Sequence, residues 1–249
     1  MSRRQGWPAA DDASVSAMTR SALHHTGTKP AAVPVTAGGV PTKPRLRGWL
    51  HAAMTPVMLV AILALMVRTD SRPGRAALAI YLVTALLLFG NSAAYHRIVW
   101  SRRVSALLRR FDHSNIALFI AGTYTPLAVL LLTGAPRVTL LGVVWGCALA
   151  EVVSRNLWME APRMLYTGLY IAMGCAAVGW LPQLWQAGGP AVVLLIAVGG
   201  LFYILGAIVY ALRKPDPWPS WFGFHELFHT GTVIGALCHF AAIWVAVGR

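Results

Sequence analysis

Apolar runs long enough to cross a lipid bilayer recur along the chain from residue 48 to residue 247. A transmembrane helix needs about 20 mostly apolar residues, and turns containing Gly and Pro separate several of these runs. Only 12% of the residues are charged, against about 25% in a soluble domain. The sequence therefore predicts an all-α polytopic membrane protein, a seven-helix bundle with transmembrane helices at 48–67, 76–96, 111–132, 138–154, 163–181, 190–212 and 224–247.

The positive charge is distributed unevenly between the two sides of this predicted bundle. Of the 21 Lys and Arg residues, 16 fall in the segments on the N-terminal side of the membrane and 5 on the other side. Because cytoplasmic loops carry the excess of Lys and Arg, we expect a cytoplasmic N-terminus and a multi-pass protein of the bacterial plasma (inner) membrane. The basic loops would lie against anionic lipid headgroups, so membrane lipids are the expected partners and no nucleic acid is needed to explain the net charge of +13.

The first 43 residues differ in composition from the rest of the chain. They are rich in Ala, Thr, Ser, Pro and Gly and show no periodic apolar pattern. Such a segment buries too little apolar surface to offset the entropy lost on ordering, and it lacks the apolar region of a signal peptide. We predict a disordered cytoplasmic tail over 1–43, in which His24 and His25 have no role, and a membrane domain over 44–249.

The stretch HELFH, residues 225–229, matches the H-E-x-x-H pattern of metalloproteases. In that pattern two histidines on one helical face bind zinc and the glutamate is the general base. Here the motif opens a long apolar run, so three interpretations compete: a protease, a different zinc site, or no site.

The predicted topology brings further polar residues to the cytoplasmic end of the bundle. Ser92 and His96, spaced i, i+4, lie near the end of the second helix, Asp112 lies near the start of the third, and His225 and His229 lie near the start of the seventh. Ionisable groups within a membrane generally face the bundle interior. Three neutral imidazoles and a water would complete a tetrahedral Zn²⁺ site with an open position; the competing interpretation makes each histidine an isolated interhelical hydrogen-bonding group.

Three other histidines stand apart from this set. His239 lies on the same helical stripe as His225 but about 21 Å further along the helix, too far for one metal ion, so we expect an interhelical hydrogen bond. His113 should point elsewhere than Asp112. His51 lies near the inner end of the first helix, where backbone or lipid headgroups could partner it.

Three blocks carry a resemblance to the bacterial hemolysin III family, within the progestin and adipoQ receptor superfamily that includes the adiponectin receptors. The chain resembles the family from about residue 45 to residue 247 through RLRGWLH (45–51) and, more specifically, through NSAAYH (91–96), LRRFDHSNIALFIAGTYTP (108–126) and FGFHELFHTGTVIGALCHF (222–240).

The resemblance implies a seven-helix bundle with a cytoplasmic N-terminus and assigns a role to each member of the polar set. Its zinc ligands fall on His96, His225 and His229, its serine near the metal on Ser92, and its aspartate holding the metal-bound water on Asp112. The receptor branch has glutamine at the position of Glu226, which argues against a required glutamate. A zincin would also need a third ligand downstream, and no acidic residue follows Glu226.

Three function classes follow from these observations. In the first, the chain is a zinc-dependent hydrolase of a lipid amide or ester, with Asp112 as general base and Ser92 stabilising the developing charge. The second is a pore-forming, cytolytic protein, as the family name suggests, although the helices lack a continuous polar lining. The third is a regulator or receptor of membrane homeostasis with structural zinc. The sequence leaves the substrate and the oligomeric state open.

Overall fold

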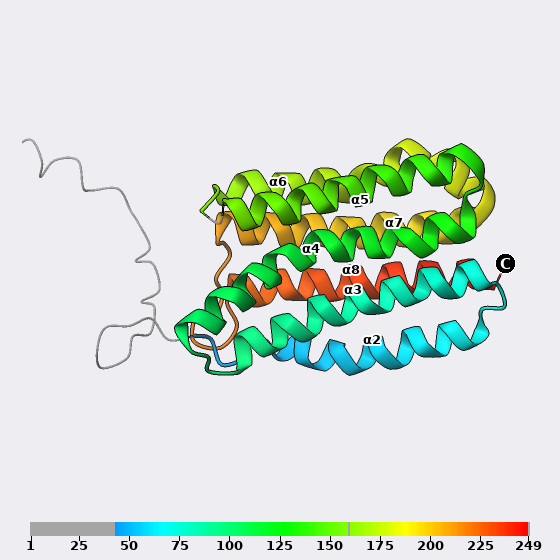
Figure 1. The fold of residues 1–249 in the computed structure, drawn as a ribbon. Helices are drawn as coiled ribbons and strands as arrows, with labels where there is room; N and C mark the ends of the chain where they lie inside the picture. Colours follow the sequence, from blue (N-terminus) through cyan, green and yellow to red (C-terminus); the bar gives the residue numbers. More distant parts are fainter. Residues whose placement is uncertain (1–42, 159, 249) are drawn as a thin grey trace, which may run out of the picture. The chain divides into compact units, whose positions relative to one another are not determined.

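The computed structural model describes residues 43–158 and 160–248 of the 249-residue chain, so the predicted tail lies almost entirely outside the described part. The described residues form an all-α bundle (Figure 1). Its elements in chain order are α2 (Trp49–Arg68), α3 (Arg72–Arg97), α4 (Arg102–Leu131), α5 (Gly134–Leu157), α6 (Arg163–Gly174), the 3₁₀ segment η1 (Cys175–Trp180), α7 (Leu181–Leu212) and α8 (Phe224–Val247).

Six helical segments in the described part are long and apolar enough to cross a membrane, which confirms a polytopic membrane protein. One of them, Arg163–Leu212, runs for 50 residues through α6, η1 and α7. The backbone of α7 leaves helical geometry at Gly189, with φ 71° and ψ 179°, directly before Pro190. In Figure 1, α6 and the labelled part of α7 lie side by side because the chain turns back at the end of the bundle opposite the start of α6.

Helix α4 begins earlier than the apolar pattern predicted. We expected a helix from residue 111, whereas α4 starts at Arg102. The Ser101 side chain accepts a hydrogen bond from the backbone N–H of Val104 and so caps the helix, as serine does at many helix starts. The added turns are basic and exposed, so hydropathy alone missed them.

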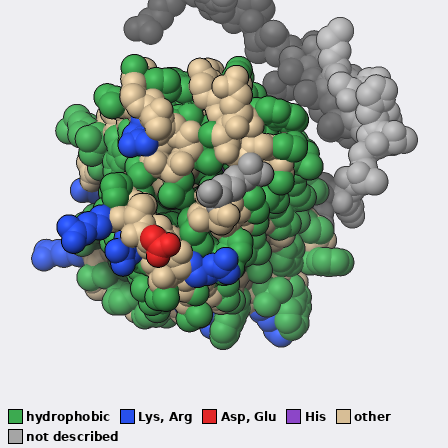
Figure 2. Space-filling model, turned by 90° about the vertical axis from the view of Figure 1, so that its right-hand side faces the viewer, with side chains coloured by type: hydrophobic (Ala, Val, Ile, Leu, Met, Phe, Trp, Pro, Cys, Tyr) green, Lys and Arg blue, Asp and Glu red, His purple; other side chains and the backbone are tan. Residues whose placement is uncertain are grey.

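The bundle surface carries the apolar residues that a lipid-facing surface needs. Large side chains such as Val60, Val67 and Leu194 are exposed on the flanks, while Met58, Tyr81 and Phe89 are buried among the helices. Hydrophobic side chains also make up most of the surface in Figure 2, which looks at the bundle end opposite the start of α8.

Helices α7 and α8 pack closely because glycines face each other across their contact. A Cβ atom added at Gly231 would lie 2.7 Å from the carbonyl oxygen of Phe202 and 3.1 Å from the Cα atom of Gly206. Small residues of this kind let helix backbones approach each other in membranes. This contact fixes the position of α8, the helix that carries the HELFH motif.

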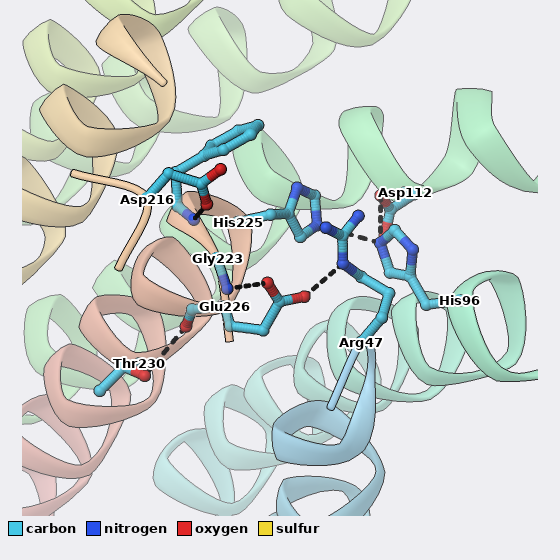
Figure 3. Close-up of polar contacts among 9 residues, drawn as sticks. Arg47, His96, Asp112, Asp216, Gly223, His225, Glu226 and Thr230 are labelled. Atoms are coloured by element: carbon cyan, nitrogen blue, oxygen red, sulfur yellow. Dashed lines mark hydrogen bonds and ion pairs between the residues drawn. The ribbon is translucent and has the colours of Figure 1, made fainter. Parts of the chain in front are cut away.

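The segment before α2 is clasped to the start of α8. The backbone N–H groups of Arg45 and Leu46 donate to the carbonyl oxygens of Ser220 and Trp221 at 3.0 and 3.1 Å. The Arg47 guanidinium forms an ion pair with the Glu226 carboxylate, as Figure 3 shows. We call the contacts of Arg45, Leu46 and Arg47 with residues 220–226 the clasp.

Glu226 has a second contact, inside α8 itself. Its Oε2 atom accepts a hydrogen bond of 2.8 Å from the backbone N–H of Gly223, and the residue is only 1% exposed. Reaching back from the third helical position, the side chain satisfies one of the free N–H groups at the helix start. Glu226 therefore stabilises the first turn of α8 and attaches it to Arg47.

We predict that Glu226→Ala lowers the free energy of unfolding by roughly 2–4 kcal/mol, because it leaves the Arg47 charge and the Gly223 N–H without partners. Glu226→Gln should lose less, since its amide oxygen still accepts from Gly223. Thermal unfolding of the detergent-purified variants measures both changes, with the exposed Arg103→Ala as the matched control. Equal stability of Glu226→Ala and wild type would contradict the clasp's role.

Candidate metal centre

Three histidines from two helices converge at one end of the bundle. His96 lies in the last turn of α3, and His225 and His229 lie on one face in the first two turns of α8. One ring nitrogen from each of the three lies within 4.8 Å of those of the other two. The Nε2 atoms of His96 and His225 are 3.2 Å apart.

These distances fit a transition-metal ion. Zinc binds histidine nitrogen at about 2.0–2.1 Å with tetrahedral geometry, which places two ligand nitrogens about 3.3 Å from each other. The His96–His225 pair is already at that separation, and because the His229 nitrogen lies within 4.8 Å of both, closing the difference takes no more than about 1.5 Å. The donor set is all imidazole, which suits Zn²⁺ rather than Mg²⁺ or Ca²⁺.

Asp112 and Ser92 lie beside the three histidines without joining them. The Oδ2 atom of Asp112, on α4, is 3.9 Å from Nε2 of His96. Ser92, 1% exposed, precedes His96 by one turn of α3 and lies against the Asp112 carboxyl group. Among the described residues, the compact group of potential metal ligands contains the histidines but not Asp112.

A cavity of about 440 Å³ opens from this cluster into the bundle. The five residues that the sequence grouped all line it, together with Arg47 and His51. Its deeper walls are mostly apolar, and they include Leu88, Phe119, Ile120, Leu127, Leu140 and Ile196. A cavity of this size and lining is typical of small-molecule sites.

The structure corrects our expectation for His51. It meets neither backbone nor headgroup: the residue is 3% exposed, and neither ring nitrogen has a hydrogen-bond partner among the described residues. Its ring stacks on that of His229, with centroids 3.8 Å apart and planes 5° from parallel, and contacts the Phe89 ring edge-on at 5.0 Å. His51 thus holds the ring plane of His229 from α2.

The other two histidines of the described helices contact backbone carbonyl groups through their rings. His239 Nε2 lies 3.1 Å from the carbonyl oxygen of Ile196 on α7, the interhelical hydrogen bond expected for it. His113 Nδ1 is 2.8 Å from the carbonyl oxygen of Arg109, and its ring faces Tyr166 of α6. His113 is therefore engaged with Arg109 and Tyr166 and is not a member of the three-histidine group.

Sequence reasoning missed several residues that complete the site. Arg47 is part of the clasp and borders the cavity, and the Tyr210 ring lies 5.8 Å from that of His225. Gly48, with φ 81°, brings the start of α2 so close that an added Cβ would lie 2.7 Å from Cβ of His96. The RLRGWLH block held a signal for two of them, since a glycine between an arginine and the start of an apolar run is a local departure from the pattern.

Comparison with known proteins assigns the chain to a family. A sequence profile described as Haemolysin-III related matches residues 40–240. The chain is 33% identical over 135 residues to a hemolysin-3 homolog of Bacillus subtilis, covering 54% of this chain and 63% of that protein. It is 31% identical over 163 residues to hemolysin-3 of Bacillus cereus, covering 64% of this chain and 74% of that protein.

A eukaryotic relative matches as well. An adiponectin receptor protein of Drosophila melanogaster is 29% identical over 188 residues, which cover 66% of this chain. The chain spans 63% of the Bacillus subtilis protein and 40% of the Drosophila protein, less than two thirds of either. The profile nevertheless covers most of the described residues, and the chain belongs to the haemolysin-III-related family.

Proposed function

We propose that this membrane protein is a zinc-dependent hydrolase of a lipid amide or ester, with its site at the cytoplasmic face. One observation carries the proposal: His96, His225 and His229 bring their ring nitrogens within 4.8 Å of one another at the mouth of a largely apolar cavity, with Asp112 beside them. Three histidine ligands with a position left open are the arrangement of catalytic rather than structural zinc sites.

The proposal includes a topology of seven spans with a cytoplasmic N-terminus. A straight helix of 50 residues would measure about 75 Å, more than twice the thickness of the hydrocarbon core, so Arg163–Leu212 is better explained by two crossings joined near Gly189. Its first and last residues then lie on the side of the excess Lys and Arg, which supports a cytoplasmic metal centre in the inner membrane of a bacterium.

Each residue of the site has a defined task in this proposal. Zn²⁺ held by the three histidines would supply a Lewis acid that polarises a carbonyl group and lowers the pKa of water. Asp112 accepts the proton from the attacking water, the task of a general base, and the Ser92 hydroxyl donates a hydrogen bond to the oxygen on which charge develops. The apolar cavity binds the acyl chain and excludes bulk water.

The contacts of Glu226 argue against a metalloprotease. In that mechanism the glutamate of H-E-x-x-H must reach the water at the metal. Here Glu226 bonds to Arg47 and to the backbone of Gly223, and it is not among the residues that line the cavity. The glutamate is engaged in holding the helix and is not available as a base.

The names of the relatives keep two other functions in view. Proteins called hemolysin-3 suggest membrane permeabilisation, and one called adiponectin receptor protein suggests a receptor. In a receptor or regulator the proposed zinc would be structural. Dye release from liposomes, unaffected by loss of the metal ligands, would favour permeabilisation over hydrolysis. Four protein ligands on the metal and no exchangeable water would favour the regulator.

We expect one zinc per chain in detergent-purified protein, measured by mass spectrometry of metal content. The double variant His225→Ala/His229→Ala should lose the metal, because one histidine cannot hold zinc alone. His239→Ala is the matched control, since this histidine lies on α8 but outside the cluster and should leave the zinc content unchanged. Properly folded wild-type protein without metal would refute the proposed site.

We expect Asp112→Asn to retain zinc and to lower turnover of lipid amides or esters by at least about 100-fold, the lower range for loss of a general base. Ser92→Ala should retain zinc and lose less, because only one hydrogen-bond donor disappears. Turnover is measured on a panel of acyl amides and esters in nanodiscs, with metal content determined on the same samples. If Asp112→Asn turned over substrate at the wild-type rate, Asp112 would not be the base.

A further inference from the structure

A buried arginine borders the cavity on the side away from α8. Arg155 lies near the end of α5, is 3% exposed, and its guanidinium lies over the Tyr166 ring, 4.0 Å from the centroid. Its Nε and Nη1 atoms have no hydrogen-bond partner among the described residues. Because a guanidinium stays charged in proteins, its burial calls for an anionic or hydrogen-bonding partner.

The nearest acidic side chain on the same helix does not neutralise Arg155 by direct contact. Glu151 lies one turn earlier, is 6% exposed, and accepts a hydrogen bond from the Ser154 hydroxyl at 3.2 Å. Within residues 43–158 and 160–248, no ion pair within 4.0 Å joins Glu151 to Arg155. The arginine, which borders the cavity, therefore keeps unused donors.

The charged residues around the cavity are predominantly basic. Among its lining residues the charged ones are Arg47, Arg109, Asp112, Arg155 and Arg163. Arg47 is paired with Glu226, and Arg163 donates to the carbonyl oxygen of Tyr210 at 3.0 Å. Among the buried cations that line the cavity, Arg155 thus has the most unused donors. A negatively charged group bound in the cavity could accept hydrogen bonds from them.

A second hollow, of about 190 Å³, lies on the other side of the same two side chains. Arg155 and Tyr166 line both the cavity and this hollow. The hollow is also bordered by Trp158, Leu165 and Leu169, which are exposed on the flank of α5 and α6. Glu151 lines it as well, with an Oε1 atom that has no hydrogen-bond partner among the described residues. Arg155 stacked on Tyr166 therefore forms a thin wall between the cavity and the lipid-facing flank.

We infer that Arg155 and Tyr166 form a subsite for the phosphate of an anionic lipid that enters sideways between α5 and α6. Arg155 lies near the end of α5 at which the metal centre is found, and phosphate is the anionic group that every phospholipid headgroup carries. A planar guanidinium binds phosphate through paired hydrogen bonds. The hollow admits the headgroup from the flank, and the apolar cavity takes a chain.

The subsite lies close enough to the metal centre to orient a substrate. The Tyr166 ring is 6.1 Å from the ring of His113, which directly follows Asp112 on α4. Arg155, Tyr166 and Asp112 line the same cavity, so a lipid held by its phosphate at Arg155 would extend its acyl linkage into the space that Asp112 also borders. The lipid-binding subsite stands on its own contacts, and only the claim that the bound lipid is the substrate rests on the proposed hydrolase function.

Native mass spectrometry of the full chain in a neutral detergent tests this inference. The probes are phosphatidic acid, phosphatidylcholine with the same chains, oleate and inorganic phosphate. We expect phosphatidic acid to bind best, and Arg155→Met to weaken its binding about tenfold, the effect of losing a charge-assisted hydrogen bond. Arg155→Lys should lose part of this preference, and the exposed Arg103→Met at the same end of the bundle should lose none.

Three outcomes would overturn the subsite. They are equal binding of phosphatidic acid and phosphatidylcholine, a preference for oleate over phosphatidic acid, or unchanged binding by a folded Arg155→Met variant. The Glu151→Gln variant distinguishes a lipid-binding role of Arg155 from a purely structural one. It should retain or raise the preference for phosphatidic acid. Loss of that preference in Glu151→Gln would mean that Arg155 serves only as the partner of Glu151.

The zinc content of the same samples keeps the two proposals distinguishable. Arg155-dependent lipid binding by protein without zinc would support the subsite and refute the hydrolase. Zinc-loaded protein that hydrolyses lipids without headgroup preference would support the hydrolase and refute the subsite.

Discussion

The absence of water from the bilayer interior constrains this bundle more than any other condition. A polar group carried into that region has to find its partner within the protein. The bundle encloses the described histidines, Asp112, Glu226 and Arg155. Glu226 finds its partners in Arg47 and in the turn before α8, and His239 finds one on α7, whereas Arg155 keeps donors free among the described residues. The polar residues therefore have to converge where the helices pack against one another, and the candidate metal centre lies at such a place.

The position of the cluster depends on contacts that carry no chemistry. Glycines between α7 and α8 set how deeply α8 sits in the bundle, and the clasp sets where its first turn begins. His225 and His229 lie within the first six residues of that helix, so a shift of one turn would move both rings by about 5 Å. The stacked ring of His51 then restricts the rotation of His229.

The sequence predicted the helices and the composition of the cluster well, because both depend on periodic or local signals. Hydropathy placed α8 at its observed bounds, and helix spacing grouped Ser92 with His96. It failed where pairing between distant segments decides the outcome. Three contacts illustrate this: the stacking of His51 on His229, the pairing of Arg47 with Glu226, and the burial of Arg155 against Tyr166. They join residues 178, 179 and 11 positions apart, respectively, and no periodicity records such contacts.

The HELFH stretch illustrates how environment decides the role of a motif. Its spacing places two histidines on one face in any helix, and that property is used here at the candidate metal centre. Glu226 directly follows His225, so its side chain projects about 100° around the helix from that of His225. What this face of the helix contacts differs from protein to protein. Here it meets Arg47 and the N–H of Gly223, so a residue that serves as a base in one setting holds a helix start in another. The shared letters specify a helix face, and the surrounding chain specifies its use.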